Sequence, residues 1–243
     1  MSDRCSLRVA LLFAASLGLV GVTPAITKDA PARYQTVPAN ADGIGKAYMG
    51  RQIAHVMGFQ GAAWLEREER ESEERSDLLL QILAPVSGST VADVGAGTGY
   101  YSRRLADLVG RTGKIYAIDV QPEMFATLQS LAKQRGYGHI MPVLGTVRDV
   151  KLPAASVDLA IMVDVYHELE FPYEVLASVV QAVKPGGRVV FVEYRAEDSR
   201  VPIKRLHKMS ETQIRREAEL HPLTWERTAN DLPWQHVVIF RRK

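Results

Sequence analysis

Three glycines at alternate positions mark the stretch of the sequence that most clearly indicates a ligand-binding site. Gly95, Gly97 and Gly99 follow Asp93, and an apolar, β-rich run over Thr90–Val94 leads into them. The residues after the turn show the apolar period of a helix. A strand, a glycine turn and a helix are the arrangement by which open α/β sheets receive a nucleotide at their strand ends. The pattern predicts a nucleotide-type ligand here, and the alternative is a tight turn without a ligand.

A second acidic residue supports a nucleotide-type ligand. The segment Lys114–Asp119 reads as the next strand and ends in Asp119, about twenty residues beyond the last glycine. A carboxylate at this place can accept hydrogen bonds from both hydroxyl groups of a ribose. Pro122 suits the first turn of the following helix, which is expected over residues 122–134.

Polar side chains also follow the fourth expected strand, Val157–Val163. Asp164, Tyr166, His167 and Glu168 come directly after it, and strand ends face the ligand crevice in a parallel sheet. His167 is the best candidate for a general base because the ordinary pKa of histidine lies near neutrality. Asp164 and Tyr166 complete this candidate catalytic group. A histidine held by hydrogen bonds at the top of the sheet explains the position of His167 equally well.

The sequence gives less support for a functional role of two other histidines. His207 lies in a polar segment, residues 195–209, that could close over a substrate, although a plain surface histidine is the simpler interpretation. His236 lies beside Trp234 on the last expected strand and is interpreted as structural. No cluster of histidines and acidic residues has the sequence spacing of a metal site, so no bound metal is expected.

The full pattern, Asp93-x-Gly95-x-Gly97-x-Gly99, resembles the first motif of the class I S-adenosylmethionine (SAM)-dependent methyltransferases. The resemblance covers residues 85–243 and includes the turn Lys184–Gly187, which precedes an apolar strand. The resemblance implies that SAM is the cofactor. It also implies that residues just after the third strand contact the adenine. Asp149 lies there and is either an acceptor for the adenine amino group or a simple turn residue. The cofactor-binding residues expected on this basis are Asp93, Gly95, Ala96, Gly97, Gly99, Asp119, Val120, Thr146, Asp149 and Asp164.

The resemblance also implies the fold. It is an α/β, Rossmann-like sheet of seven strands in the order 3-2-1-4-5-7-6, with the last strand antiparallel and with helices on both faces. The segments expected to form these strands are Thr90–Val94, Lys114–Asp119, Ile140–Leu144, Val157–Val163, Arg188–Tyr194, Leu223–Thr228 and Trp234–Arg241.

The expected activity is the transfer of a methyl group from SAM to an oxygen, nitrogen or carbon atom of a small molecule. The sequence lacks the N/D-P-P-Y/F motif of many nucleic-acid methyltransferases, and its formal net charge of +2 does not favour a nucleic-acid partner. One alternative is a protein that binds SAM or a nucleoside without catalysis. A second is an NAD-dependent oxidoreductase, which the glycine spacing disfavours because the dinucleotide motif is G-x-G-x-x-G.

A charged segment precedes the glycine motif. Residues 62–83 read as one long helix, and Glu66 to Asp77 contains no apolar residue. A solvated helix face explains this composition, since charged pairs four residues apart support an exposed helix. The other interpretation is that the helix crosses the mouth of the cofactor pocket, where Arg67 or Arg70 would face the carboxylate of SAM.

The first residues have the features of a secretory signal peptide. Arg4 and Arg8 precede an apolar run, and cleavage is expected after Ala25. The predicted organisation is a signal peptide (1–25), a linker (26–45), a helical extension (46–84) and the methyltransferase domain (85–243). The protein is therefore expected to be exported and to have no membrane span after cleavage. The alternatives are that the segment is an uncleaved membrane anchor, or that the start codon is misassigned and the protein is cytoplasmic. Cys5 is the only cysteine and would leave with the signal.

Overall fold

The structure is a computed structural model, and it describes Met1, residues 33–38 and residues 40–243 of the 243-residue chain. The predicted signal peptide, apart from Met1, and the first part of the predicted linker lie outside the described residues. No helix of the described part combines the length and the apolar character needed to cross a bilayer.

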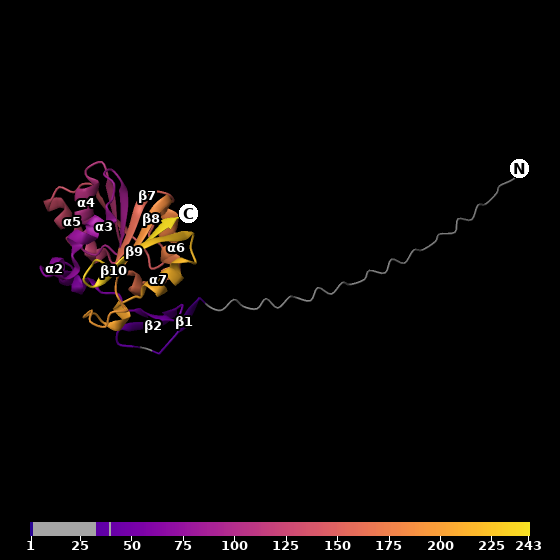
Figure 1. Ribbon diagram of the computed structural model, residues 1–243. Coiled ribbons are helices and arrows are strands. Elements are labelled where there is room, and N and C mark those ends of the chain that lie inside the picture. Colours follow the sequence, from indigo (N-terminus) through magenta and orange to yellow (C-terminus); the bar gives the residue numbers. More distant parts are fainter. Residues whose placement is uncertain (2–32, 39) are drawn as a thin grey trace. The chain divides into compact units, whose positions relative to one another are not determined.

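A seven-stranded sheet organises the described part of the chain (Figure 1). Its order is β6-β5-β4-β7-β8-β10-β9, and β10 is antiparallel to both β8 and β9. In chain order this is 3-2-1-4-5-7-6, so the predicted fold is confirmed. The strands are β4 (Thr90–Val94), β5 (Lys114–Asp119), β6 (Ile140–Leu144), β7 (Val157–Val163), β8 (Val183–Tyr194), β9 (Leu223–Ala229) and β10 (Gln235–Arg242).

Helices cover both faces of this sheet, because side chains along each buried strand alternate between two apolar clusters. Val91, Ile161 and Val190 pack with α3, α4 and α5, whereas Ala92, Met162 and Phe191 pack with α6 and α7 on the opposite face. Figure 1 shows these two groups of helices on opposite sides of β7 and β8. The helices are α3 (Ser76–Leu83), α4 (Tyr100–Val109), α5 (Pro122–Gln134), α6 (Pro172–Ala182) and α7 (Glu211–Ala218).

The start of the described part is a small antiparallel sheet, which corrects the predicted linker and helical extension. It consists of β1 (Tyr34–Thr36), β2 (Gly43–Tyr48) and β3 (Arg51–Ala54). Met49 and Gly50, both with positive φ, form the two-residue turn between β2 and β3. Two central residues with positive φ are the feature of a hairpin turn whose twist matches the strands, so a helix does not form here.

The charged segment is three short helices, where the sequence predicted one long helix. They are α1 (Ala62–Leu65), α2 (Arg70–Glu74) and α3. Arg75 adopts the left-handed conformation, with φ of 53°, and separates α2 from α3. The Glu71 carboxylate accepts hydrogen bonds from the Ser76 hydroxyl and from the Asp77 N–H, at 2.9 Å for the latter. Glu71 thus satisfies a free N–H at the start of α3 and stabilises the break.

Candidate active site

A cavity of about 1000 Å³ opens at the carboxyl ends of the parallel strands. The ends of β4, β5, β7 and β8 border it, as do residues of β2, α1 and α2. The polar segment around the 3₁₀ turn η3 (Arg205–His207) supplies another part of the wall. Parallel α/β sheets bind ligands at this edge.

The glycine turn at the end of β4 brings the backbone to the cavity. Gly95 and Gly97 line it and have φ of 73° and 54°, a region that favours glycine. A Cβ atom at Gly95 would lie 2.4 Å from Val165 Cγ2, and one at Gly97 would lie 2.6 Å from Leu65 Cδ1. Both glycines are therefore required by conformation and by close packing, and they leave room for a ligand beside the turn.

Asp119 lies where the sequence placed it, at the end of β5 and on the cavity wall. Its Oδ2 accepts a hydrogen bond from the Gly97 N–H at 2.8 Å, and its Oδ1 accepts one from the Gln121 N–H at 2.9 Å. Burial raises the pKa of the carboxyl group, and these backbone donors oppose that shift. The carboxylate is thus fixed before any ligand arrives, and each oxygen keeps acceptor capacity for a ribose hydroxyl.

Three expected cofactor residues do not line the cavity: Asp93, Ala96 and Gly99. Asp93 is buried under the turn and accepts a hydrogen bond from the Ser102 hydroxyl of α4 at 2.6 Å. Burial raises the pKa of Asp93 to about 6. Gly99 leads into α4 beside the side chain of Leu128. Asp93 and Gly99 therefore connect the turn to α4 and α5 and do not face the cavity.

The residues expected near an adenine do border the cavity. Val120, Thr146 and Asp149 lie on its wall. The Asp149 carboxylate already accepts a hydrogen bond from the Lys151 N–H at 2.8 Å and pairs with the Lys151 Nζ at 2.9 Å, and these contacts lower its pKa. A role for Asp149 toward adenine stays a prediction.

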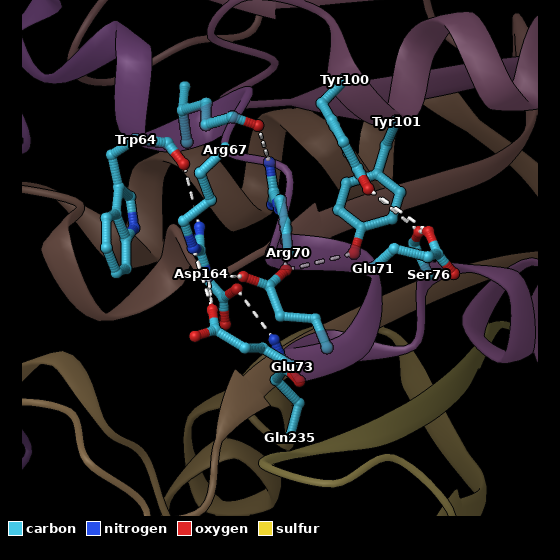
Figure 2. A network of polar contacts seen from close by, with 12 residues as sticks. Trp64, Arg67, Arg70, Glu71, Glu73, Ser76, Tyr100, Tyr101, Asp164 and Gln235 are labelled. Carbon is cyan, nitrogen blue, oxygen red and sulfur yellow. Dashed lines mark hydrogen bonds and ion pairs between the residues drawn. The ribbon is translucent and has the colours of Figure 1, made fainter.

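A buried charge network forms part of the cavity wall (Figure 2). Glu74 pairs with Arg67 Nη2 and with Arg70 Nε, each at 2.8 Å, and accepts a hydrogen bond from the Tyr194 hydroxyl at 3.2 Å. Arg67, Arg70 and Glu74 all line the cavity. The charged segment therefore forms a wall of the pocket, and the interpretation as a solvated helix face is wrong for these residues. Contact of either arginine with a SAM carboxylate stays a prediction.

Asp164 is the residue of this network that is least satisfied. Its φ is 51°, and its Oδ2 accepts a hydrogen bond from Gln235 Nε2 at 3.2 Å. Its Oδ1 is buried without a hydrogen-bond partner in the described part of the chain. Burial, together with the charges of Glu74 and Glu193, raises its pKa well above the ordinary range. A buried acceptor without a partner at a cavity wall suits a ligand that carries N–H donors, such as the ammonium group of SAM.

His167 lies on the same wall, on the 3₁₀ turn η2 (Tyr166–Glu168), and is almost fully buried. Its Nδ1 lies 2.6 Å from Glu193 Oε2, and its Nε2 lies 3.2 Å from His207 Nδ1. The other Glu193 oxygen accepts a hydrogen bond from the Tyr166 N–H at 2.8 Å. Burial acts to lower the pKa of His167, but the Glu193 carboxylate raises it above its usual value. Burial and the neighbouring His167 lower the pKa of His207 to about 4.

Tyr166 does not join this group, which corrects its place in the predicted catalytic set. Its side chain is fully buried, packs edge-on against Phe191 and is not among the residues that line the cavity. In a tight 3₁₀ turn, adjacent side chains point in different directions. His167 and Glu168 therefore reach the cavity while Tyr166 enters the core.

Two residues gain importance that sequence reasoning did not give them. Glu193 fixes the His167 ring, and His207 contacts His167, where a surface position was preferred. Glu168 lines the cavity, as its place after the fourth strand predicted. Glu193 follows four consecutive apolar residues near the carboxyl end of β8. An acidic residue at such a place is a signal that the sequence did contain.

The comparisons with known proteins agree with this geometry. Residues 92–191 match a family described as a methyltransferase domain. The chain is 27% identical over 124 residues to demethylmenaquinone methyltransferase of Bacillus licheniformis, covering 51% of this chain and 53% of that protein. It is 31% identical over 115 residues to protein-L-isoaspartate O-methyltransferase of Aeropyrum pernix, covering 46% and 41%. The chain thus spans about half the length of the relatives it matches.

Solved structures share the fold. A SAM-dependent methyltransferase from Aquifex aeolicus has a TM-score of 0.72 at 24% identity, over 76% of this chain and 98% of that one. A [4+2]-cyclase, SpnF, has a TM-score of 0.60 at 15% identity, over 69% of this chain and 80% of that one. The chain therefore has the fold of the class I methyltransferases, and residues 92–191 match a methyltransferase domain. This fold and this match imply that SAM is the cofactor.

Proposed function

We propose that the protein transfers the methyl group of SAM to an oxygen, nitrogen or carbon atom of a small molecule. The observation that carries this proposal is one cavity bordered by the Gly95–Gly97 turn, by Asp119 and by His167. The residues proposed to bind the cofactor and the side chain proposed to act on the acceptor therefore line the same cavity. Among the relatives, demethylmenaquinone methyltransferase is named for a small-molecule acceptor, which supports the acceptor class.

The residues of the cavity divide into two groups in this proposal. Asp119 holds the ribose, the Gly95–Gly97 backbone passes beside the methionine part, and Asp164 receives the ammonium group. Bound SAM supplies an electrophilic methyl group, whose carbon–sulfur bond breaks as the acceptor atom attacks, leaving a neutral sulfide. The wall around His167 binds the acceptor and prepares its attacking atom. The chain mainly positions the two reactants.

A screen of small molecules with methyl-labelled SAM and protein from its native compartment tests this proposal. Label transferred to an acceptor supports it, whereas SAM retained without turnover on any acceptor supports a non-catalytic binding protein. Once an acceptor is known, His167→Ala is expected to lower turnover by about 10²–10⁴-fold, the usual contribution of a group that acts on a transferred proton. The SAM affinity of this variant should stay near that of the wild type.

The control for His167→Ala is His139→Ala, because His139 contacts the Ala106 carbonyl and lies outside the cavity. Normal turnover in His167→Ala would contradict the proposed acceptor position. A collapse of SAM binding would instead assign His167 to the cofactor part of the site.

We also propose that the protein is exported, on the basis of the Arg4/Arg8 region, the apolar run and the small residues near Ala25. Amino-terminal sequencing of the protein from its native host should find a mature chain that begins after Ala25. An intact Met1 on the cytoplasmic protein would show that the segment is retained.

A further inference from the structure

We propose that His167, Glu168 and His207 form a binding site for one divalent transition-metal ion at the acceptor end of the cavity. Each residue offers one ligand atom, and these atoms lie within 4.8 Å of one another. Two imidazoles and one carboxylate are a donor set typical of catalytic zinc and of non-haem iron(II). The chain segments are far apart in sequence, since His167 and Glu168 lie on η2 and His207 lies on η3.

The ring of His167 is already oriented as a metal ligand would be. Its Nδ1 donates to Glu193, a residue without solvent exposure, and this leaves Nε2 directed at His207. Metal-bound histidines commonly hold their other ring nitrogen against a carboxylate in this way. Glu193 is held in turn by the Tyr166 N–H, so the ring has little freedom.

The distance between the two imidazoles fits a shared ion. Two nitrogens 3.2 Å apart, each about 2.0–2.1 Å from an ion, subtend an angle of about 100° at it, which is close to tetrahedral. The same distance is also compatible with a hydrogen bond between the rings. The arrangement therefore admits an ion without requiring the rings to separate.

Glu168 can supply the third ligand because one of its oxygens is uncommitted. Its Oε2 accepts a hydrogen bond from the Met57 N–H at 3.1 Å, and its Oε1 has no hydrogen-bond partner within residues 33–38 and 40–243. All three side chains line the cavity. An ion held by them would keep at least one coordination position open toward the acceptor, as in catalytic zinc sites.

This site would act on an acceptor that carries an oxygen donor. An ion lowers the pKa of an oxygen bound to it, so a hydroxyl group bound there would lose its proton before it attacks the methyl carbon. This consequence rests on the proposed methyl transfer, whereas the metal site itself does not. Donor sets that contain imidazole favour zinc, iron, copper or nickel over magnesium, calcium and manganese, which prefer oxygen ligands.

The test uses the full chain without a histidine tag, stripped of metal with a chelator and titrated with Zn²⁺ in the absence of SAM. We expect one ion per chain by calorimetry and by elemental analysis after dialysis. His207→Ala and Glu168→Ala should each weaken Zn²⁺ binding by more than about 100-fold. Glu193→Gln, which removes the carboxylate behind the His167 ring, should weaken it by about 10–100-fold. His139→Ala, outside the cavity, should bind Zn²⁺ as the wild type does.

Two results would overturn the metal site: no stoichiometric Zn²⁺ binding, or binding that His207→Ala and Glu168→Ala leave unchanged. Circular dichroism and thermal denaturation of each variant show whether its fold is intact. Equal rates of methyl transfer by chelator-treated and by Zn²⁺-loaded protein would reject the proposed action of the ion on the acceptor, and would leave the proposed function standing. Zn²⁺ binding in a protein that does not bind SAM would reject the proposed function and retain the metal site.

Discussion

Asp119 illustrates how single residues prepare this site for a ligand. Both of its oxygens are held by backbone N–H groups, from Gly97 and from Gln121. The carboxylate therefore connects the glycine turn of one strand to the end of the next. A ligand that binds its remaining lone pairs meets a group that has already lost its conformational freedom.

The first prediction concerns Asp119→Ala. The variant should bind SAM more weakly by about tenfold to a hundredfold for each ribose hydrogen bond lost, since a hydrogen bond to a charged group contributes about 1.5–3 kcal/mol. Calorimetric titration with SAM measures the change. Asp107→Ala serves as the control because Asp107 contacts Tyr137 outside the cavity. Unchanged SAM affinity in Asp119→Ala would show that the residue does not contact the cofactor.

The second prediction concerns the pH dependence that Asp93 gives to stability. Burial raises its pKa to about 6, compared with about 3.9 in an unfolded chain. The folded state therefore binds this proton more tightly, and the resulting stability is present below about pH 4 and lost as the pH rises through about 6.

Asp93→Asn removes this titration and keeps an acceptor for Ser102. Relative to the wild type, the free energy of unfolding of the variant should rise between pH 4 and pH 7 by up to about 3 kcal/mol. Urea denaturation at several pH values measures it, and Asp107→Asn corrects for the general loss of a carboxylate. A difference between Asp93→Asn and wild type that does not vary with pH would contradict the raised pKa.

Individual side chains at the site could be predicted from the sequence only where a motif fixes the backbone. Gly95, Gly97 and Asp119 lie at strand ends, and the sequence placed them at the cavity. The direction of Tyr166 was mispredicted and the role of Glu193 was not predicted, because both depend on the 3₁₀ turn after β7 and on pairing between β7 and β8. Neither the turn nor the register is encoded in the spacing of nearby residues.

The β4–turn–α4 unit is the element on which the rest of the site depends. Gly95 lies against Val165, which precedes the η2 turn that carries His167. The cofactor part and the acceptor part of the cavity are therefore in direct contact at this glycine.

The third prediction tests that contact with a matched pair of variants. Gly95 and Gly136 have nearly the same φ, 73° and 71°, but a Cβ atom meets Val165 at Gly95 and nothing within 4 Å at Gly136. Gly136→Ala should lose about 1–2 kcal/mol of stability from backbone strain alone. Gly95→Ala should lose about 1–3 kcal/mol more from overpacking.

Gly95→Ala should also lose SAM affinity, whereas Gly136→Ala should bind SAM as the wild type does. Thermal denaturation and SAM titration of both variants give the comparison. Equal losses of stability, with SAM affinity kept in both, would mean that the contact between Gly95 and Val165 has no consequence for the site.

Elements with strong periodicity were predicted well, and the amino-terminal elements were not. The central strands β4 and β7 are largely apolar, which follows from burial on both faces. The β2–β3 hairpin has no such apolar run, and its turn is marked only by Met49 and Gly50. The charged segment lacks any apolar residue from Glu66 to Asp77, so its division into α1, α2 and α3 depends on contacts such as Glu71 with α3.

In the described part of the molecule, the candidate functional residues lie at one edge of the sheet. The two faces are covered by helices, so the carboxyl ends of the strands remain as the place where polar groups gather. The α1–α2 segment and the polar segment around η3 close this edge from elsewhere in the chain. Both segments contribute to the cavity wall from outside the sheet, and we expect them to select the acceptor.

The most direct test of this account is a calorimetric titration of the full chain with SAM, compared with the same titration with NAD⁺. SAM should bind with one molecule per chain, because the turn at Gly95 and Gly97 and the carboxylate of Asp119 border one cavity. NAD⁺ should not bind, because the glycine spacing departs from the dinucleotide motif. Saturable binding of NAD⁺ without binding of SAM would contradict the assignment of the cofactor and, with it, the proposed methyl transfer.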